Sequence, residues 1–430
     1  MAVTGWFVAL VALGVVPIIA TDSDLALLAW LALVAVLTTL DVLLAASPRR
    51  LRLRRELPAA VRLGESAVAR LVVVNDGGRT LRGLLRDAWQ PSAGAAPTRR
   101  RVVLRPGRAV TLTATLTPFR RGDRRADAVT VRSIGPLRLA GRQATLELPG
   151  TVRVLPRFSS RKHLPSRLAR LRELDGRTSV MVRGQGTEFD SLREYVRGDD
   201  VRSIDWRATA RRDDLVVRTW RPERDRRVVV VVDSGRTSAA RVGDEPRLDT
   251  AIESALLLGA LASRAGDRVD VVVFDRRVRG RVQGATGPAL LSSMVDTLAP
   301  IEAELVDTDW SSVPALVRQV TTQRALVVLA TTVDSPGSAR SLLAALPQLT
   351  RKHLVVVASV TDPSLDERAV RRGDRTEVWQ AAAAERARLD VARVATALGQ
   401  VGADVVSASP VDLPPALADR YLALKAAGRL

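Results

Sequence analysis

The sequence predicts a multidomain protein with two N-terminal transmembrane helices, a small all-β sandwich-like domain and a C-terminal doubly wound, Rossmann-like α/β domain. Two apolar stretches open the chain, short strands with turn sequences come next, and from residue 227 onward apolar strands alternate with helices. With 430 residues, 47% of them hydrophobic, the chain can form two or three cores. We place a membrane hairpin at 1–48, a β domain at 49–158, a linker with a charged segment at 159–226 and the α/β domain at 227–430.

The two apolar stretches, residues 2–20 and 25–46, are each long enough to cross the hydrocarbon core of a bilayer as a helix. Only residues 21–24 separate them, which is enough for a tight helical hairpin. A secretory signal peptide is the alternative for the first stretch. No basic residues precede that stretch, however, and a second apolar stretch comes directly after it.

The orientation of the hairpin is indicated by five arginines just after the second stretch, which the positive-inside rule keeps in the cytoplasm. They are Arg49, Arg50, Arg52, Arg54 and Arg55. We therefore expect a two-span protein of the cell membrane with both termini and the soluble domains in the cytoplasm. Asp41, the one ionisable group within a span, lies near the inner end, where we expect it to reach headgroup water.

Residues 49–158 carry the signals of a β domain. A β-rich run over residues 67–74 closes in the turn sequence Asn75-Asp76-Gly77-Gly78, and residues 111–117 alternate with period two. Further strands are predicted over residues 102–104, 128–132 and 151–155. Short strands at this spacing predict a sandwich. No catalytic constellation is visible in this region, so we expect a spacer or interaction domain.

The α/β domain begins with residues 227–232, a continuous apolar run that ends in Asp233 and is typical of a strand buried on both faces. Further strands are predicted over 269–274, 278–282 (at an edge), 325–330, 354–360 and 403–407. The intervening helices are predicted over 248–265, 289–298, 313–320, 339–349, 381–398 and 415–427. Ligands of such a domain bind at the carboxyl ends of its strands.

The composition excludes several kinds of site. The chain has no cysteine and only two histidines, so thiolate sites, disulfides and multi-histidine metal sites are ruled out. Both His163 and His353 lie in surroundings that favour a structural role. The net charge of +20 raises nucleic acid as a partner. Because the arginines are spread along the whole chain and lysine is nearly absent, we disfavour that partner.

The turn after the first α/β strand reads Asp233-Ser234-Gly235-Arg236-Thr237. It contains neither Gly-x-Gly-x-x-Gly nor Gly-Lys-Ser/Thr, so we do not expect nucleotide binding here. Its carboxylate and hydroxyls are oxygen ligands that suit a hard cation such as Mg²⁺. An equally simple role for Asp233 is to cap the loop or helix after it.

The order of these elements and the Asp at the end of the first strand resemble a von Willebrand factor A domain. The metal-ion-dependent adhesion site of that family is written Asp-x-Ser-x-Ser, with a Thr after the third strand and an Asp after the fourth. The resemblance implies a Mg²⁺ site formed by Asp233, Thr237, Thr286 and Asp334. Gly235 stands where the family has its central Ser, which removes one ligand and leaves a degenerate site.

Residues 184–218 are the most information-dense part of the chain, because Asp, Glu and Arg stand there around a few apolar anchors. Their pattern, Gly-x-Glu-Phe-x-x-Leu-Arg-Glu-Tyr-x-x-Gly-Asp-Asp-x-Arg-x-Ile-Asp-Trp, resembles the signature of the bacterial family known as domain of unknown function 58. The matching residues are Glu188, Phe189, Leu192, Arg193, Glu194, Tyr195, Gly198, Asp199, Asp200, Arg202, Asp205, Trp206 and Arg207. The resemblance extends over essentially the whole chain. It implies a membrane-anchored protein encoded beside an AAA+ ATPase of the MoxR type, with an assembly or chaperone-like role and no established enzymatic activity.

We therefore expect a non-enzymatic, membrane-anchored adaptor whose cytoplasmic A-like domain engages a MoxR-type ATPase. One alternative is a metal-assisted hydrolase that uses Asp199, Asp200 and Asp205 together with Asp233. The arginines around these carboxylates favour ion pairing instead, so we predict that the segment is a charge-paired clasp against the A-like domain. The other alternative, a nucleic-acid-binding membrane protein, rests on net charge alone.

Overall fold

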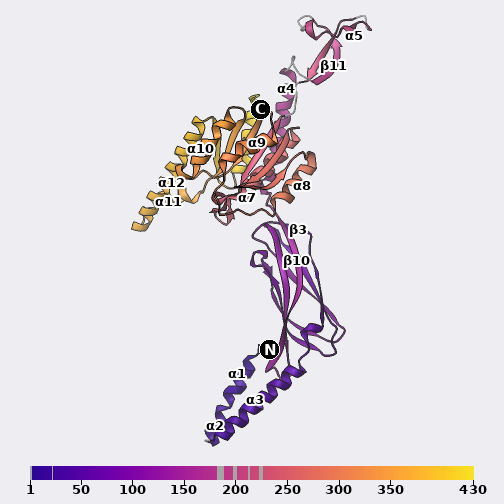
Figure 1. Cartoon of the computed structure of the whole chain (residues 1–430), viewed down its shortest axis with the longest axis vertical. Coiled ribbons are helices and arrows are strands. Elements are labelled where there is room, and N and C mark those ends of the chain that lie inside the picture. Colours follow the sequence, from indigo (N-terminus) through magenta and orange to yellow (C-terminus); the bar gives the residue numbers. More distant parts are fainter. Residues whose placement is uncertain (1, 22, 182–187, 197–200, 212–213, 222–225) are drawn as a thin grey trace. The chain divides into compact units, whose positions relative to one another are not determined.

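The computed structural model describes residues 2–21, 23–181, 188–196, 201–211, 214–221 and 226–430. The chain divides into two compact units, Met1–Leu155 and Pro156–Leu430 (Figure 1). The first unit combines the N-terminal helices with the β strands, and the second holds the charged segment and the α/β domain.

The first unit opens with helices α1 (Gly5–Leu13), α2 (Val15–Thr21) and α3 (Asp24–Leu44). The helix predicted over residues 2–20 is therefore interrupted. Its first residues instead form strand β1 (Ala2–Val3), which pairs with strand β10. Among the described residues, one segment, Asp24–Arg50, is long and apolar enough to cross a membrane, whereas two spans were predicted.

The interruption lies at Gly14, where α3 packs closely against the first two helices. A Cβ atom at Gly14 would come within 2.2 Å of Cδ1 of Trp30. The indole Nε1 of Trp30 donates a hydrogen bond to the carbonyl oxygen of Leu10 at 3.2 Å. The apolar composition of residues 2–20 did not reveal this break, because a glycine inside an apolar run is compatible with a continuous helix.

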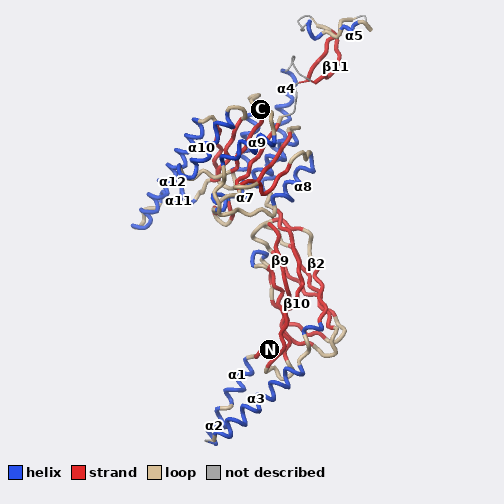
Figure 2. The backbone as a smooth tube through the Cα atoms, viewed as in Figure 1, coloured by secondary structure: helices blue, strands red, loops and turns tan. Residues whose placement is uncertain are grey.

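Two sheets form the rest of the first unit (Figure 2). One has the order β1-β10-β9-β5-β7 with β3 beside β10, and the other has the order β2-β4-β8-β6. The strands are β2 (Leu51–Glu56), β3 (Ala60–Arg62), β4 (Ala67–Asn75), β5 (Leu81–Trp89), β6 (Ala95–Ala96), β7 (Arg99–Leu104), β8 (Ala109–Leu116), β9 (Gly122–Ile134) and β10 (Ala140–Leu155). Buried residues of both sheets, among them Val73 and Val131, share one core cluster, so the sheets pack face to face.

The second unit contains a six-stranded sheet with the order β17-β16-β13-β18-β19-β20. Its strands are β13 (Arg227–Asp233), β16 (Arg268–Phe274), β17 (Val278–Val282), β18 (Ala325–Ala330), β19 (Leu354–Val360) and β20 (Ala403–Ala408). All neighbours are parallel except β17, which runs antiparallel to β16. The chain leaves β13 toward one side and returns on its other side at β18. This reversal opens the crevice in which ligands of such sheets bind.

Helices cover both faces of this sheet. The α-helices that come after β13 are α6 (Arg236–Ala239), α7 (Arg247–Arg264), α8 (Gly287–Leu298), α9 (Val313–Val320), α10 (Pro336–Thr350), α11 (Ser364–Val370), α12 (Arg375–Gln400) and α13 (Leu413–Ala426). Alternate valines of β13 point to opposite faces. Val230 packs with α7, α8 and α13, and Val231 packs with α9, α10 and α12. Because both faces are buried, the strand reads as a continuous apolar run in the sequence.

Candidate functional site

Asp233, the last residue of β13, is the centre of a polar cluster at the carboxyl edge of the parallel sheet. It is 1% exposed. Its Oδ1 accepts hydrogen bonds from the backbone N–H of Gly235 at 2.8 Å and from the hydroxyl of Thr308. Its Oδ2 accepts hydrogen bonds from the hydroxyls of Thr237 at 3.0 Å and Thr331 at 2.6 Å. Four donors thus surround one buried carboxylate, which satisfies its need for partners away from water.

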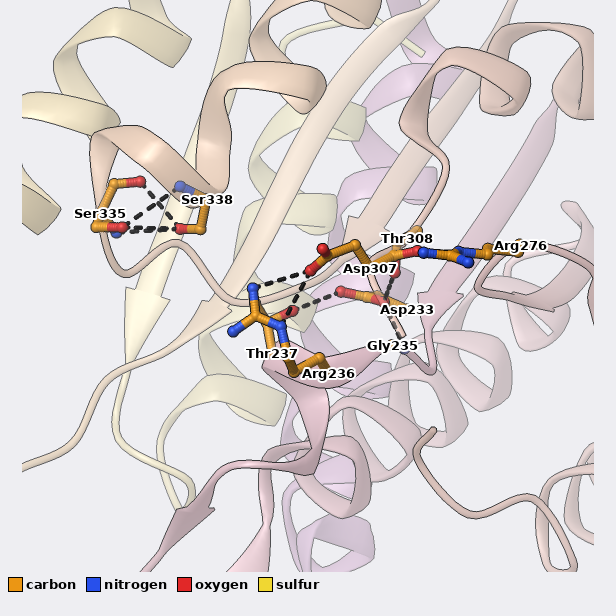
Figure 3. Close-up of polar contacts among 9 residues, drawn as sticks. All are labelled: Asp233, Gly235, Arg236, Thr237, Arg276, Asp307, Thr308, Ser335 and Ser338. Carbon is orange, nitrogen blue, oxygen red and sulfur yellow. Dashed lines mark hydrogen bonds and ion pairs between the residues drawn. The ribbon is translucent and has the colours of Figure 1, made fainter. Parts of the chain in front are cut away.

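Three separate parts of the fold bring these donors together. Thr237 lies in α6 directly after β13, and Thr331 comes after β18, the neighbouring parallel strand. Thr308 comes from the connection between α8 and the short 3₁₀ helix Trp310–Ser312. Figure 3 shows Thr237 and Thr308 approaching Asp233 from different elements.

Gly235 stands where the adhesion motif has a serine, and the structure explains the glycine by space. A Cβ atom at this position would lie 2.3 Å from Oγ1 of Thr308 and 2.8 Å from the carbonyl oxygen of Val306. Thr308 therefore occupies the volume that a side chain at position 235 would need. Its hydroxyl supplies the oxygen that the glycine lacks.

The other two residues of the sequence-based metal set lie elsewhere. Thr286 is exposed and comes after β17; because β17 runs antiparallel, its end lies at the sheet edge opposite Asp233. Asp334 pairs with Arg247 at 2.5 Å between Oδ2 and Nη1. The structure therefore brings Asp233 and Thr237 together, without Thr286 or Asp334 among the donors to Asp233.

A second buried carboxylate, Asp275, comes after β16 at the same edge. Its Oδ2 accepts a hydrogen bond from the hydroxyl of Ser234 at 3.2 Å. Its Oδ1 accepts the backbone N–H groups of Arg276 at 2.6 Å and Arg277 at 3.1 Å. Asp275 thus holds the turn after β16, while Ser234 links it to the residue next to Asp233.

Charged side chains stand at the exposed rim of this cluster. Arg236 forms two hydrogen bonds to Oδ1 of Asp307, from Nε at 3.0 Å and from Nη2 at 2.8 Å. Arg276 donates from Nε to the carbonyl oxygen of Asp307 at 3.4 Å (Figure 3). Because both members of the Arg236–Asp307 pair are exposed, solvent screens it and it contributes little to stability.

The donor set around Asp233 fits Mg²⁺ better than any softer metal. Within the described part of the chain, no group of three or more His, Cys, Asp or Glu side chains could enclose a metal ion. Mg²⁺ differs from other metals in that it takes one or two carboxylates and keeps several waters. Each hydroxyl that donates to Asp233 keeps its oxygen lone pairs free. One carboxylate and three threonine hydroxyls are therefore compatible with a partly hydrated magnesium ion.

The charged segment contains strands β11 (Glu188–Glu194) and β12 (Val216–Arg221), which pair antiparallel, and the short helix α5 (Trp206–Thr209). Sequence periodicity had indicated no such sheet. Of the signature residues, Glu188 and Phe189 lie in β11, as do Leu192, Arg193 and Glu194. Gly198, Asp199 and Asp200 lie outside the described residues, so the predicted clasp stays a prediction.

Asp205 has a local structural role in this segment. Its Oδ1 accepts the backbone N–H groups of Arg207 and Ala208, both at 3.0 Å, and so caps the start of α5. The backbone N–H of Tyr195 donates to the carbonyl oxygen of Leu215 at 2.8 Å, which continues the pairing beyond β11. Arg202 and Arg207 are exposed, and Trp206 as a whole residue is 65% exposed.

Comparison with known proteins agrees with the signature in this segment. Residues 191–396 match the family described as "Protein of unknown function DUF58". The DUF58 match covers just under half of the chain, from β11 into α12, and includes Asp233 and its four donors.

Mycobacterial proteins are similar to part of the chain. Uncharacterized protein Rv1480 of Mycobacterium tuberculosis and uncharacterized protein Mb1516 of Mycobacterium bovis are each 29% identical to it over 119 residues. The matched stretch is 28% of this chain and 38% of each relative, so the chain spans well under half the length of these proteins.

Among solved structures, the CARDB domain of the PF1109 protein from Pyrococcus furiosus aligns with 26% of this chain and 89% of its own, at 22% identity and a TM-score of 0.19. A PapD-like domain of human CEP192 aligns with 24% of this chain and 84% of its own, at 15% identity and a TM-score of 0.19.

Proposed function

We propose that this protein is a non-enzymatic, membrane-anchored adaptor whose α/β domain binds a partner protein at the carboxyl edge of its sheet. The proposal rests on one observation. The buried carboxylate of Asp233 accepts hydrogen bonds from three threonine hydroxyls and a backbone N–H at this edge. The strand order and the antiparallel edge strand β17 support the resemblance to a von Willebrand factor A domain. In such a domain this edge is a binding face.

Two observations favour binding over catalysis. The group that most often serves as general base is a histidine within hydrogen-bond reach of the nucleophile or of the hydrolytic water. His353 stands just before β19, at the amino edge of the parallel strands, which is the edge opposite Asp233, and His163 precedes helix α4 (Leu164–Met181). Asp205, one member of the alternative hydrolase set, is used as the cap of α5.

We further propose that Mg²⁺ binds at Asp233, with Thr237, Thr308 and Thr331 as neighbouring oxygen ligands. A bound magnesium ion would offer remaining coordination positions to an acidic side chain of the partner. Calorimetric titration of the purified full chain with Mg²⁺ should show binding that Asp233→Asn weakens at least about tenfold. Asp296→Asn, which changes an exposed carboxylate on α8, should leave binding unchanged. Equal binding by the two variants would contradict this assignment.

The partner that we propose is a MoxR-type AAA+ ATPase, in an assembly or maturation role, because the charged segment matches a signature that implies such a neighbour. The proposed anchor is the hairpin of α1, α2 and α3, with the soluble domains in the cytoplasm. The arginines after α3 support this orientation.

Cross-linked capture from membranes tests the function. The tagged full chain should recover a MoxR-type ATPase, Asp233→Asn should recover much less, and Asp296→Asn should recover as much as the native chain. Failure of the native chain to recover such an ATPase would contradict the partner. Undiminished recovery by Asp233→Asn would contradict the binding face.

A further inference from the structure

We propose that the end of the first unit next to α3 is a binding surface for the headgroups of anionic phospholipids. This inference rests on the proposed membrane anchor and adds a lipid class that the anchor alone does not require. Six exposed arginines gather at this end from four separate segments: Arg49, Arg50, Arg79, Arg105, Arg108 and Arg138. We call these six residues the arginine collar.

Asn75, at the end of β4, brings two of the four segments together, and its neighbour Asp76 adds a third. Its Nδ2 donates to the carbonyl oxygens of Arg79 and Leu104, both at 2.9 Å, and its backbone N–H donates to the carbonyl oxygen of Arg108 at 3.2 Å. Asn75 as a whole residue is 2% exposed. The β4–β5 and β7–β8 connections are therefore fixed side by side. The segment Pro48–Arg50 joins them, because the backbone N–H of Asp76 donates to the carbonyl oxygen of Arg50 at 3.0 Å.

Asp41 attaches the fourth segment, the β9–β10 turn, to the membrane helix. This residue of α3 is fully buried, and its carboxylate accepts the backbone N–H groups of Leu137 at 2.7 Å, Leu139 at 2.8 Å and Ala140 at 2.9 Å. The expectation that Asp41 reaches headgroup water is therefore wrong. The turn, including Arg138, is held at the end of the proposed span.

Two arginines add direct contacts with the last turn of α3. Arg79 donates from Nη1 to the carbonyl oxygen of Leu43 at 2.6 Å, and Arg142 donates from Nε to the carbonyl oxygen of Val42 at 2.9 Å. Helix carbonyls at this end lack partners within the helix, so these bonds satisfy them. The collar is thus fixed at the depth where a span ending near Ala45 meets the headgroups.

The β9–β10 turn holds Arg138 in an unfavourable backbone conformation and leaves the neighbouring Leu137 exposed. Arg138 has a φ of 60°, the left-handed region where glycine is the residue of lowest cost. The neighbouring Leu137 is 48% exposed. An apolar side chain beside an arginine, both held next to the end of a span, suits the boundary between acyl chains and headgroups.

The charge balance of this end favours anions. The one acidic side chain within the β4–β5 turn, Asp76, is paired with Arg52 at 3.0 Å. Clustered arginines on the cytoplasmic side of a span attract anionic lipids, and the attraction falls off within about 8 Å at physiological ionic strength. The collar meets this distance requirement because it is attached directly to α3.

The experiment measures lipid selectivity of the full chain. The protein is reconstituted in vesicles of equimolar phosphatidylglycerol and phosphatidylcholine, extracted in mild detergent, and the retained lipids are quantified by mass spectrometry. We expect clear enrichment of phosphatidylglycerol. The triple variant Arg105→Gln/Arg108→Gln/Arg138→Gln should lower the enrichment at least about tenfold. The corresponding lysine triple variant should retain most of it, because a lysine also attracts phosphate.

The matched control changes three exposed arginines elsewhere in the same unit, Arg86→Gln/Arg99→Gln/Arg120→Gln, and should keep the native enrichment. Equal loss in both glutamine variants, or no enrichment by the native chain, would overturn the inference. Displacement of phosphatidylglycerol by inorganic phosphate would overturn it as well, because the surface would then bind a free ion.

A carbonate wash of the vesicles separates this inference from the proposed function. Retention of the chain without lipid preference overturns the arginine collar alone. Release of the chain by carbonate overturns the anchor and the collar together.

Discussion

At the scale of single residues, the site is defined by the Asp233 carboxylate and by the side chains that pack around it. Asp233 has two oxygens and four donors, and Thr308 fills the volume beside Gly235. The glycine that looked like a lost ligand in the sequence is therefore a steric requirement of Thr308. The two positions have to be considered together.

The close packing of Thr308 against Gly235 predicts how substitutions at these two positions change stability. Gly235→Ser should lower the free energy of unfolding by about 1–3 kcal/mol, because the new Cβ collides with Oγ1 of Thr308. Adding Thr308→Ala should recover part of the loss by freeing that volume. Gly337→Ser, at a position with open space around its Cβ, should change stability little. Denaturant unfolding of the α/β domain in the full chain measures all three. An unchanged free energy of unfolding in Gly235→Ser would contradict the steric explanation.

His353 gives a prediction on pH. Burial, and after it the charge of Lys352, lowers the pKa of this imidazole below its ordinary value. The folded state keeps the ring neutral, whereas the unfolded state takes up a proton below a pH of about 6.5. The free energy of unfolding should therefore fall as the pH drops below that value, by up to about 1.4 kcal/mol per pH unit.

His353→Gln should flatten this dependence between pH 7 and the pH at which the folded protein itself takes up the proton. Unfolding curves at a series of pH values provide the measurement. An unchanged slope in His353→Gln would show that other groups control the pH response.

The sequence predicted Asp233 and Thr237 at this site because both lie directly at the end of an unmistakable strand. It could not identify Thr308, which lies in a connection without periodicity and reaches Asp233 only in the folded chain. Thr331 carried a weak signal as the first residue after β18. Thr286 was expected there by analogy, but the direction of β17 places the end of that strand at the opposite edge.

At the scale of elements, helix α13 is attached to the start of β16 by a buried charge pair. Lys425 donates from Nζ to Oδ1 of Asp267 at 3.1 Å, and Tyr421 donates its hydroxyl to Oδ2 of Asp267 at 2.5 Å. Burial raises the pKa of Asp267, while the charge of Lys425 opposes that rise. The pair therefore fixes the last helix against the sheet at the edge opposite the candidate site.

Removing one member of the Asp267–Lys425 pair should lower the free energy of unfolding more than removing both members. Lys425→Met should lower the free energy of unfolding by about 3–5 kcal/mol at neutral pH, because it leaves a buried carboxylate without its cation. Adding Asp267→Asn should recover much of that loss. Acidification should also reduce the loss, because a protonated Asp267 carries no charge. Lys162→Met, at an exposed position, should stay within about 0.5 kcal/mol of the native chain.

Sequence patterns predicted the ranges of several strands correctly. Strand β4 occurs over Ala67–Asn75 and β13 over Arg227–Asp233, close to the ranges that alternation and apolar runs predicted. The patterns missed the break at Gly14 and the β11–β12 pair. Both depend on contacts: the first on Trp30, and the second on pairing between residues more than twenty positions apart.

At the scale of the whole molecule, each unit carries its own proposed partner. The first unit combines a helix that is long and apolar enough to cross a membrane with the arginine collar. The second presents the Asp233 edge and the charged segment that matches DUF58. The proposed adaptor uses the first unit to stay at the bilayer and the second to hold a protein there. The composition and the signature predicted a membrane anchor and a separate binding domain. The arginine collar could be recognised only in the folded chain, because its members come from four separate segments.

The most direct test measures the affinity between the full chain in nanodiscs and a purified MoxR-type ATPase, with Mg²⁺ and nucleotide held constant. Metal removal would not discriminate, because such an ATPase itself binds nucleotide with magnesium. We predict that Asp233→Asn raises the Kd at least about tenfold, a loss of about 1.4 kcal/mol, while Asp296→Asn leaves it unchanged. An Asp233→Asn chain that binds the ATPase as tightly as the native chain would contradict the proposal that the Asp233 edge is the binding face.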